Sequence, residues 1–195
     1  MEMMKAVAAM GDGTVKIVEV PKPDKVGPYD CLVRVTACGL CSSTDLKIIY
    51  NGSVAQKPVT YPTLLGHEGV GVIEQVGERV RYLKPGDRVT SPLGMLTPAP
   101  GYTQTFGGMN GYALTMDVKA MVEDGVKSPL FGMLDDPILD FPSRRIPDGM
   151  SDPDAVMLHS PHTRLTISGV EIRIRKLSMP EAVCSSSATV RLRWG

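Results

Sequence analysis

The chain has 195 residues, enough for one domain with a substantial core and part of a second. Its 21 basic residues balance 21 acidic ones, so charge gives no reason to expect a nucleic-acid or anionic-membrane partner. No apolar run approaches the ~20 residues that cross a bilayer, and the N-terminus lacks the layout of a secretory signal. With four cysteines and no export signal, we expect a cytoplasmic protein whose reduced thiols serve packing or metal binding.

The 20 glycines and 16 prolines are typical of short strands joined by turns, and not of a helical bundle. Strands are predicted, in chain order, at residues 5–9, 15–20, 31–37, 69–76, 88–90 and 112–115. Residues 42–49 predict one short helix, with a Ser or Thr available as N-cap and Asp45 in its first turn. Residues 91–104 and 127–147 are predicted to be irregular, and a second helix starts at Ser151.

The segment Leu65-Gly66-His67-Glu68-Gly69 is the first candidate for chemistry. A His followed by Glu in a glycine-rich turn suits a metal ligand beside a carboxylate that orients it or coordinates transiently. The glycines let the backbone bring the imidazole close to another segment. A surface His–Glu pair in a turn is the alternative interpretation.

The segment Cys38-Gly39-Leu40-Cys41 supplies thiols that complement this pair. A Cys at a strand-to-helix turn lies in a dipole that favours the thiolate, which is the form that binds metal. Zinc accepts Cys sulfur and His nitrogen, and a catalytic zinc keeps one position open. Cys38 ends a buried-looking strand and is predicted to be a packed core thiol. A Cys-x-x-Cys redox pair is the alternative, but its thioredoxin-type context is missing.

These pieces resemble the N-terminal, GroES-like domain of the zinc-dependent medium-chain alcohol and polyol dehydrogenases, over roughly residues 3 to 159. The resemblance rests on matching motifs that occur in family order. They are Met4-Lys5-Ala6, Val35-Thr36-Ala37-Cys38-Gly39-Leu40-Cys41, Asp45-Leu46-Lys47, Gly66-His67-Glu68-Gly69-Val70-Gly71-Val72-Ile73, Gly77-Glu78-Arg79-Val80, Pro85-Gly86-Asp87-Arg88-Val89, Gly107-Gly108-Met109-Asn110-Gly111-Tyr112-Ala113 and Ile146-Pro147-Asp148-Gly149-Met150.

The resemblance implies that Cys41 and His67 are ligands of a catalytic zinc and that Glu68 is a carboxylate able to approach the metal. A hydroxyl relays the substrate proton, and Ser43 and Thr44 compete for that role because Asp45 comes one residue later than in the commonest pattern. The third ligand of the family falls near His159, where a structural histidine is the alternative. No cysteine lies between Thr90 and Val183, so we expect no second, structural zinc.

The resemblance also implies a fold: a mainly β, GroES-like, partly open barrel with short helices (α+β) over residues 1–150. Residues 151–195 are then expected to hold the first interdomain helix and an irregular, basic stub of a Rossmann domain. No G-x-G-x-x-G turn for a dinucleotide follows the metal motifs. However, a GC-rich back-translation of Cys184–Gly195, read from its third base, gives LVVGDGPAAVG, a strand followed by G-x-G-x-x-A. We therefore expect the tail to be out-of-frame translation after a frameshift between about Leu158 and Val183.

The function implied by the resemblance is oxidation of an alcohol or polyol to a carbonyl with zinc and NAD or NADP. This chain alone is expected to be an inactive fragment that lacks the cofactor domain. We expect a small-molecule alcohol or carbonyl as partner, no nucleic acid and no membrane, and leave homo-oligomerisation open. The alternatives are a zinc-free reductase of the quinone-reductase type and a non-catalytic GroES-like oligomeric module.

Overall fold

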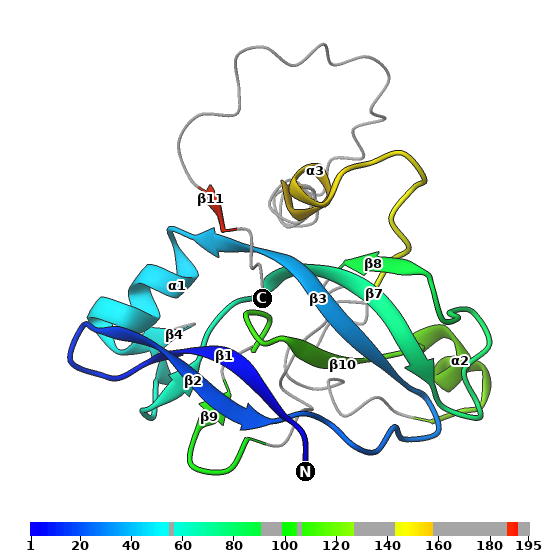
Figure 1. Cartoon of the computed structure of the whole chain (residues 1–195), viewed down its shortest axis with the longest axis horizontal. Helices are drawn as coiled ribbons and strands as arrows, with labels where there is room; N and C mark the ends of the chain where they lie inside the picture. Colours follow the sequence, from blue (N-terminus) through cyan, green and yellow to red (C-terminus); the bar gives the residue numbers. More distant parts are fainter. Residues whose placement is uncertain (55–56, 91–98, 105–106, 127–142, 158–186, 191–195) are drawn as a thin grey trace.

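The computed structural model describes residues 1–54, 57–90, 99–104, 107–126, 143–157 and 187–190. Strands dominate it and the helices are short (Figure 1). The strands are β1 (Met3–Ala9), β2 (Val15–Pro21), β3 (Asp30–Cys41), β4 (Ser53–Val54), β5 (Lys57–Pro58), β6 (Thr63–Leu64), β7 (Glu68–Val76), β8 (Arg88–Thr90), β9 (Thr103–Gln104), β10 (Tyr112–Met116) and β11 (Ser187–Val190). The helices are α1 (Thr44–Leu46), the π-helical η1 (Lys47–Asn51), α2 (Val118–Glu123) and α3 (Asp152–Met157).

Two sheets form the body of the molecule. The first has the strand order β2-β1-β6-β9, and the second has the order β10-β3-β7-β8 with β11 added to β3. The pairs β1–β2, β3–β7 and β3–β10 are antiparallel, and β9 joins β6 in parallel. β3 is the long central strand of the second sheet, and α3 lies across the ends of β3 and β7 (Figure 1). The fold therefore concentrates contacts on the strand that ends at Cys41.

The core is divided between the two sheets. One cluster of buried side chains lies on β1 and β6, with Met4, Ala6 and Leu64 among its members. A second cluster includes Cys38 and Leu65 and lies under α1 and η1. Buried and more exposed residues alternate along most of β1, and because a strand points successive side chains to opposite faces, β1 contributes to both clusters.

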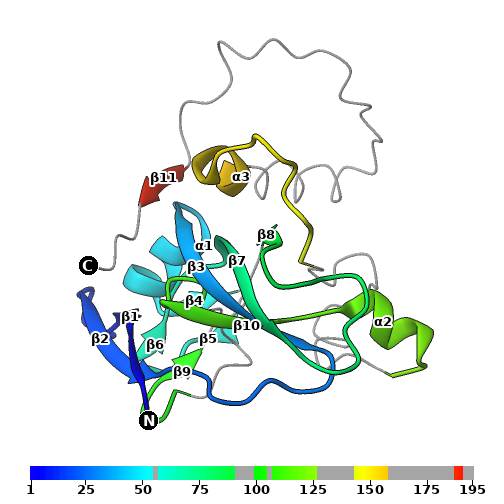
Figure 2. The same ribbon diagram turned by 45° about the vertical axis from the view of Figure 1, so that its right-hand side comes forward.

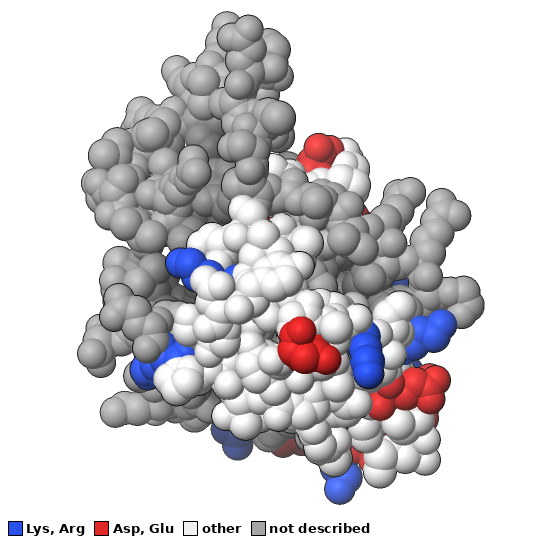
Figure 3. Space-filling view, turned by 90° about the vertical axis from the view of Figure 1, so that its left-hand side faces the viewer, with Lys and Arg blue, Asp and Glu red and all other residues white. Residues whose placement is uncertain are grey.

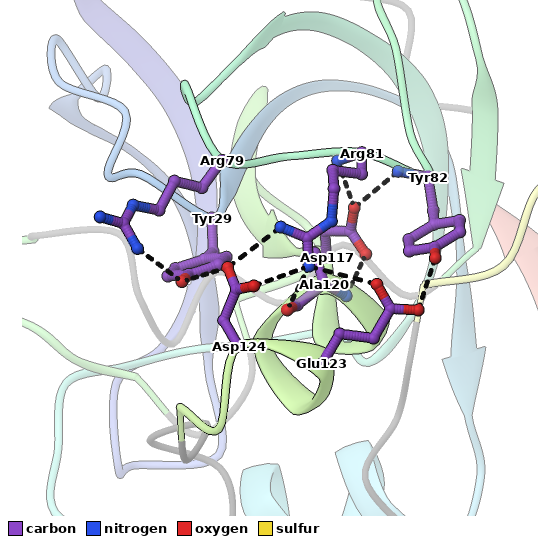
Figure 4. A network of polar contacts seen from close by, with 8 residues as sticks. All are labelled: Tyr29, Arg79, Arg81, Tyr82, Asp117, Ala120, Glu123 and Asp124. Carbon is purple, nitrogen blue, oxygen red and sulfur yellow. Dashed lines mark hydrogen bonds and ion pairs between the residues drawn. The ribbon is translucent and has the colours of Figure 1, made fainter.

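A polar network holds α2 against the segment that follows β7 (Figure 4). The buried Asp117 carboxylate caps α2 at the Ala120 amide, 3.0 Å away, and also accepts the amides of Arg81 and Tyr82 at 2.8 and 2.7 Å. The Arg81 guanidinium forms ion pairs with Glu123 and Asp124 at 3.2 and 3.0 Å. These ion pairs lie at the surface, so most of the stabilisation comes from the buried Asp117.

The mainly β fold with short helices is confirmed, and most predicted strands are present within a residue or two. The strand predicted at 31–37 extends to Cys41, because its pairing with β7 continues to Gly39. The predicted helix begins only at Thr44, and Ser43 at its N-cap position makes no side-chain capping bond, so the expected cap is wrong. α2 was not predicted, since only its cap Asp117 marks it in the sequence. Residues 170–175, the one stretch of the tail whose side chains alternate like those of a strand in the sequence, lie outside the described residues.

Charged side chains of both signs are scattered over the face shown in Figure 3. Among the described residues, no helix is long and apolar enough to span a membrane.

Candidate metal centre

The pairing of β3 with β7 brings the two chemical motifs together. The register places Gly39 opposite Glu68 and Cys38 opposite Gly69. Cys41 is the last residue of β3, and His67 directly precedes the first residue of β7. The thiol, the imidazole and the carboxylate therefore meet at one end of this strand pair, although 26 positions separate Cys41 from His67 in the sequence.

Glycines make the turn before His67 possible. Gly66 has a φ of 93°, a left-handed conformation that favours glycine, and its carbonyl accepts the Gly108 amide at 2.6 Å. The Met109 amide donates to the Leu65 carbonyl at 3.0 Å, so the segment at 108–109 holds the backbone just before His67. Gly66 and Gly108 are thus required for the close approach of their two chain segments.

The three predicted ligands form one cluster. One ligand atom each from Cys41, His67 and Glu68 lies within 4.8 Å of the other two. Nε2 of His67 is 4.0 Å from Oε1 of Glu68. Glu68 is buried, whereas Cys41 and His67 are half-buried, so the cluster is open on one side. Within the described part of the chain, this is the group of His, Cys, Asp and Glu side chains with the spacing of a metal site.

Asp45 completes the surroundings of this cluster. Its fully buried carboxylate accepts the Cys41 amide through Oδ2 at 2.9 Å and places Oδ1 3.5 Å from Nδ1 of His67. One carboxylate therefore contacts both the strand end and the imidazole, on the ring nitrogen opposite the one that faces Glu68. This role of Asp45 was not predicted from the sequence, where Asp45 stands in the first turn of a helix and in a family motif. Its burial and its contact with His67 are visible only in the structure.

The local electrostatics favour a thiolate at Cys41. Partial burial by itself raises the pKa of this thiol, but hydrogen bonds from His67 and from the amides of Thr44 and Ser43 outweigh it, and the pKa is lowered. For His67, burial lowers the pKa, whereas hydrogen bonds to Asp45 and Cys41 raise it to about 10. These hydrogen bonds favour the charged forms of both side chains, and a bound metal would compete with the proton between them.

The neighbouring thiol behaves differently. Cys38 is fully buried in the cluster under α1, and burial first, then the charge of Asp45, raises its pKa well above the ordinary value for a thiol. This confirms Cys38 as a packed core thiol, because a neutral buried thiol is a poor ligand and a poor nucleophile.

The structure leaves the proton relay undecided. Ser43 is exposed and Thr44 is partly buried, and the Thr44 amide lies 3.4 Å from the Cys41 sulfur. His159, the expected third ligand, lies outside the described residues.

The residues present fit a zinc ion. Thiolate, imidazole and carboxylate are all zinc ligands, and ligand atoms around a tetrahedral zinc lie about 3.5 Å apart, so small side-chain movements would close the cluster around an ion. The Asp45 carboxylate on the second ring nitrogen of His67 is the arrangement that commonly orients a zinc-bound histidine. This fold and this donor set define a GroES-like domain with a candidate catalytic zinc centre.

Comparison with known proteins agrees with this class. Residues 27–123 match the alcohol dehydrogenase GroES-like domain. The chain is 35% identical over 156 residues to a probable zinc-binding alcohol dehydrogenase of Mycobacterium tuberculosis, a match that covers 80% of this chain and 38% of the relative. It is 37% identical over 113 residues to the NADP-dependent isopropanol dehydrogenase of Thermoanaerobacter brockii, covering 54% of this chain and 30% of the relative.

A solved structure shows the same fold. The 2R,3R-butanediol dehydrogenase from Bacillus subtilis superposes with a TM-score of 0.52 at 23% identity, over 80% of this chain and 44% of that one. Residues 27–123 therefore belong to the alcohol dehydrogenase GroES-like domain family, and the chain is similar to the N-terminal portion of the medium-chain alcohol dehydrogenases. It spans less than half the length of these relatives.

Proposed function

We propose that this chain carries the zinc-binding catalytic part of an oxidoreductase that interconverts an alcohol or polyol and a carbonyl compound with NAD or NADP. The observation that carries the proposal is the cluster of Cys41, His67 and Glu68, three zinc-competent donors within 4.8 Å at the end of one strand pair. The family relationship suggests alcohol oxidation as the reaction class. Two relatives are named isopropanol dehydrogenase and sorbitol dehydrogenase, which suggests alcohols and polyols as the substrate class.

In this proposal Cys41 and His67 hold the metal and Glu68 approaches it from the buried side. A zinc ion bound there would act as a Lewis acid and lower the pKa of a coordinated alcohol. Asp45 fixes the orientation of the imidazole through Nδ1. Ser43 or Thr44 passes the alcohol proton toward solvent, and the exposure of Ser43 and the partial burial of Thr44 allow either role.

We further propose that the described residues provide metal chemistry and not a nucleotide site. No glycine-rich turn of the dinucleotide-binding type follows the metal motifs in the sequence, so little alcohol-dependent reduction of NAD or NADP is expected from this chain alone. His159 would be a further ligand and a structural zinc would be absent. A small alcohol or carbonyl is the expected partner in the cytoplasm.

Metal content tests the proposal. Purified protein should hold about one equivalent of zinc, and Cys41→Ser and His67→Ala should each lose it. Cys31→Ala is the matched control, because Cys31 is a buried thiol at the opposite end of β3 and should leave the metal content unchanged. Less than about a tenth of an equivalent in the parent protein would instead support the zinc-free reductase. A zinc-free ring of subunits in size-exclusion chromatography would support the oligomeric module.

A further inference from the structure

The end of β3 that carries Cys41 has one edge left open by the main sheet. β7 pairs with one edge of β3 as far as Gly39. β10 pairs with the other edge only over Asp30–Arg34, and the Val35 amide makes the last contact on that side, with the Gly111 carbonyl at 3.0 Å. Beyond Val35, neither β10 nor Gly111 reaches the backbone. An unpaired strand edge presents amides and carbonyls that accept another strand.

β11 occupies this open edge. It runs antiparallel to β3 with Ser187 opposite Cys41 and Val190 opposite Cys38. Figures 1 and 2 both show β11 beside the end of β3, with α3 next to it. The sequence predicts an irregular, out-of-frame tail here, so this four-residue strand has no counterpart among the predicted elements. Its pairing is made by the backbone of the chain as given and does not depend on the side chains of the tail.

Two of the paired residues of β3 belong to the metal cluster or lie against it. Cys41 is the thiolate ligand, and Gly39 lies so close to Glu68 that a Cβ on it would be 2.6 Å from Oε2. Such a Cβ would also be 2.9 Å from Cγ1 of Val156 on α3. A strand paired to residues 38–41 therefore fixes the backbone that sets the distance between Cys41 and Glu68.

We propose that the edge of β3 at Cys38–Cys41 is a strand-acceptor site, and that residues 187–190 act as a strap whose docking holds Cys41 in its metal-binding position. This inference deepens the proposed function and rests on it for the metal. Main-chain hydrogen bonds supply the affinity of an added strand. The docked strap and a bound metal would both favour the same backbone conformation at Cys38–Cys41. Each therefore strengthens the binding of the other by the same factor.

The test removes the strap's backbone donors in the whole chain. Alternate residues of a strand point their amides to opposite edges, so in Ala188→Pro/Thr189→Pro at least one amide that faces β3 is lost. Ala188→Ser/Thr189→Ser is the matched control, because it changes the same positions and keeps both amides. Hydrogen exchange of the amides at residues 38–41 reports docking of the strap. A titration with Co²⁺, monitored by the thiolate-to-metal charge-transfer absorption, reports metal binding.

In the proline variant, those amides of residues 38–41 that face β11 should exchange at least tenfold faster than in the serine control, whereas the amides bonded to β7 or Asp45 should be unchanged. The variant should bind Co²⁺ at least fivefold more weakly than the control, which is the lower end of ordinary coupling between two sites. Unchanged exchange would overturn the strap. Faster exchange with unchanged Co²⁺ affinity would overturn its coupling to the metal. If the parent protein binds no Co²⁺ and the proline variant still exchanges faster, the proposed metal function and its coupling to the strap are overturned. The strand-acceptor edge would stand in that case.

Discussion

Asp45 is the residue whose replacement tests the metal centre most directly. Its carboxylate is fully buried and has two oxygens in two different contacts, Oδ2 with the Cys41 amide at 2.9 Å and Oδ1 with Nδ1 of His67 at 3.5 Å. Asp45→Asn keeps the size and shape of the side chain but leaves one acceptor oxygen for two donors. Whichever way the amide turns, its NH₂ group faces either the Cys41 amide or His67.

The magnitude follows from what is lost. A carboxylate that hydrogen-bonds the other ring nitrogen of a zinc-bound histidine contributes about 10- to 100-fold to metal affinity. This corresponds to about 1.4 to 2.8 kcal/mol, because each tenfold change in affinity is about 1.4 kcal/mol. A hydrogen bond to a charged group contributes about 1.5–3 kcal/mol, which agrees with this range. We therefore expect Asp45→Asn to bind Zn²⁺ about 10- to 100-fold more weakly while the fold is retained.

The measurement is a competition titration of Zn²⁺ against a chromophoric chelator. Asp87→Asn is the matched control, because Asp87 is also a buried acid and accepts the Lys84 amide at 3.0 Å, but it lies in the turn before β8. An Asp45→Asn affinity within twofold of the parent protein would refute the reasoning. An equal loss in both variants would show that the effect comes from general destabilisation.

Three further replacements test packing and polar contacts in the described structure. Gly39→Ala places a methyl group 2.6 Å from Oε2 of Glu68 and should lower the free energy of unfolding by about 1–3 kcal/mol, measured by urea denaturation; an unchanged midpoint would contradict the crowding. Asn110→Ala should raise the melting temperature by about 2–4 °C in calorimetry, because the amide of Asn110 is fully buried with no hydrogen-bond partner and such a group costs about 1–3 kcal/mol; a lower melting temperature would show that the amide is satisfied. Asp117→Ala should cost about 3 kcal/mol of unfolding free energy in the same urea assay, because three amides lose their acceptor; a loss below about 0.5 kcal/mol would be inconsistent with the network.

The tail gives a test at the level of the gene. If residues 158–183 contain a frameshift, the DNA that follows codon 158 should encode a strand and a G-x-G-x-x-A turn in a shifted frame. Sequencing of this region in all frames decides it, and the absence of such a turn in every frame would remove the hypothesis.

Local patterns in the sequence were sufficient for most of the strands and for the ligand types. Apolar and charged side chains alternate along residues 15–20, and β-branched residues recur along 69–76, so both segments are marked as strands, although β2 is mostly exposed and β7 is buried over residues 68–71. Short elements were harder to predict. The helix predicted at 42–49 is instead split into α1 and the π-helical η1. The six residues of α2 are too short to show a helical period, and the cap by Asp117 marks its start.

The sequence by itself determined the donor types: a Cys after a strand, a His–Glu pair in a glycine turn, and the motif order that identifies the family. Tertiary structure decided which of these donors meet. The β3–β7 register aligns Gly39 with Glu68, and that pairing, with Asp45 buried beneath it, places Cys41 beside His67. It also gave the edge of β3 a partner in β11. The physical reason is that strand pairing depends on contacts between residues far apart in the chain, which no local pattern encodes.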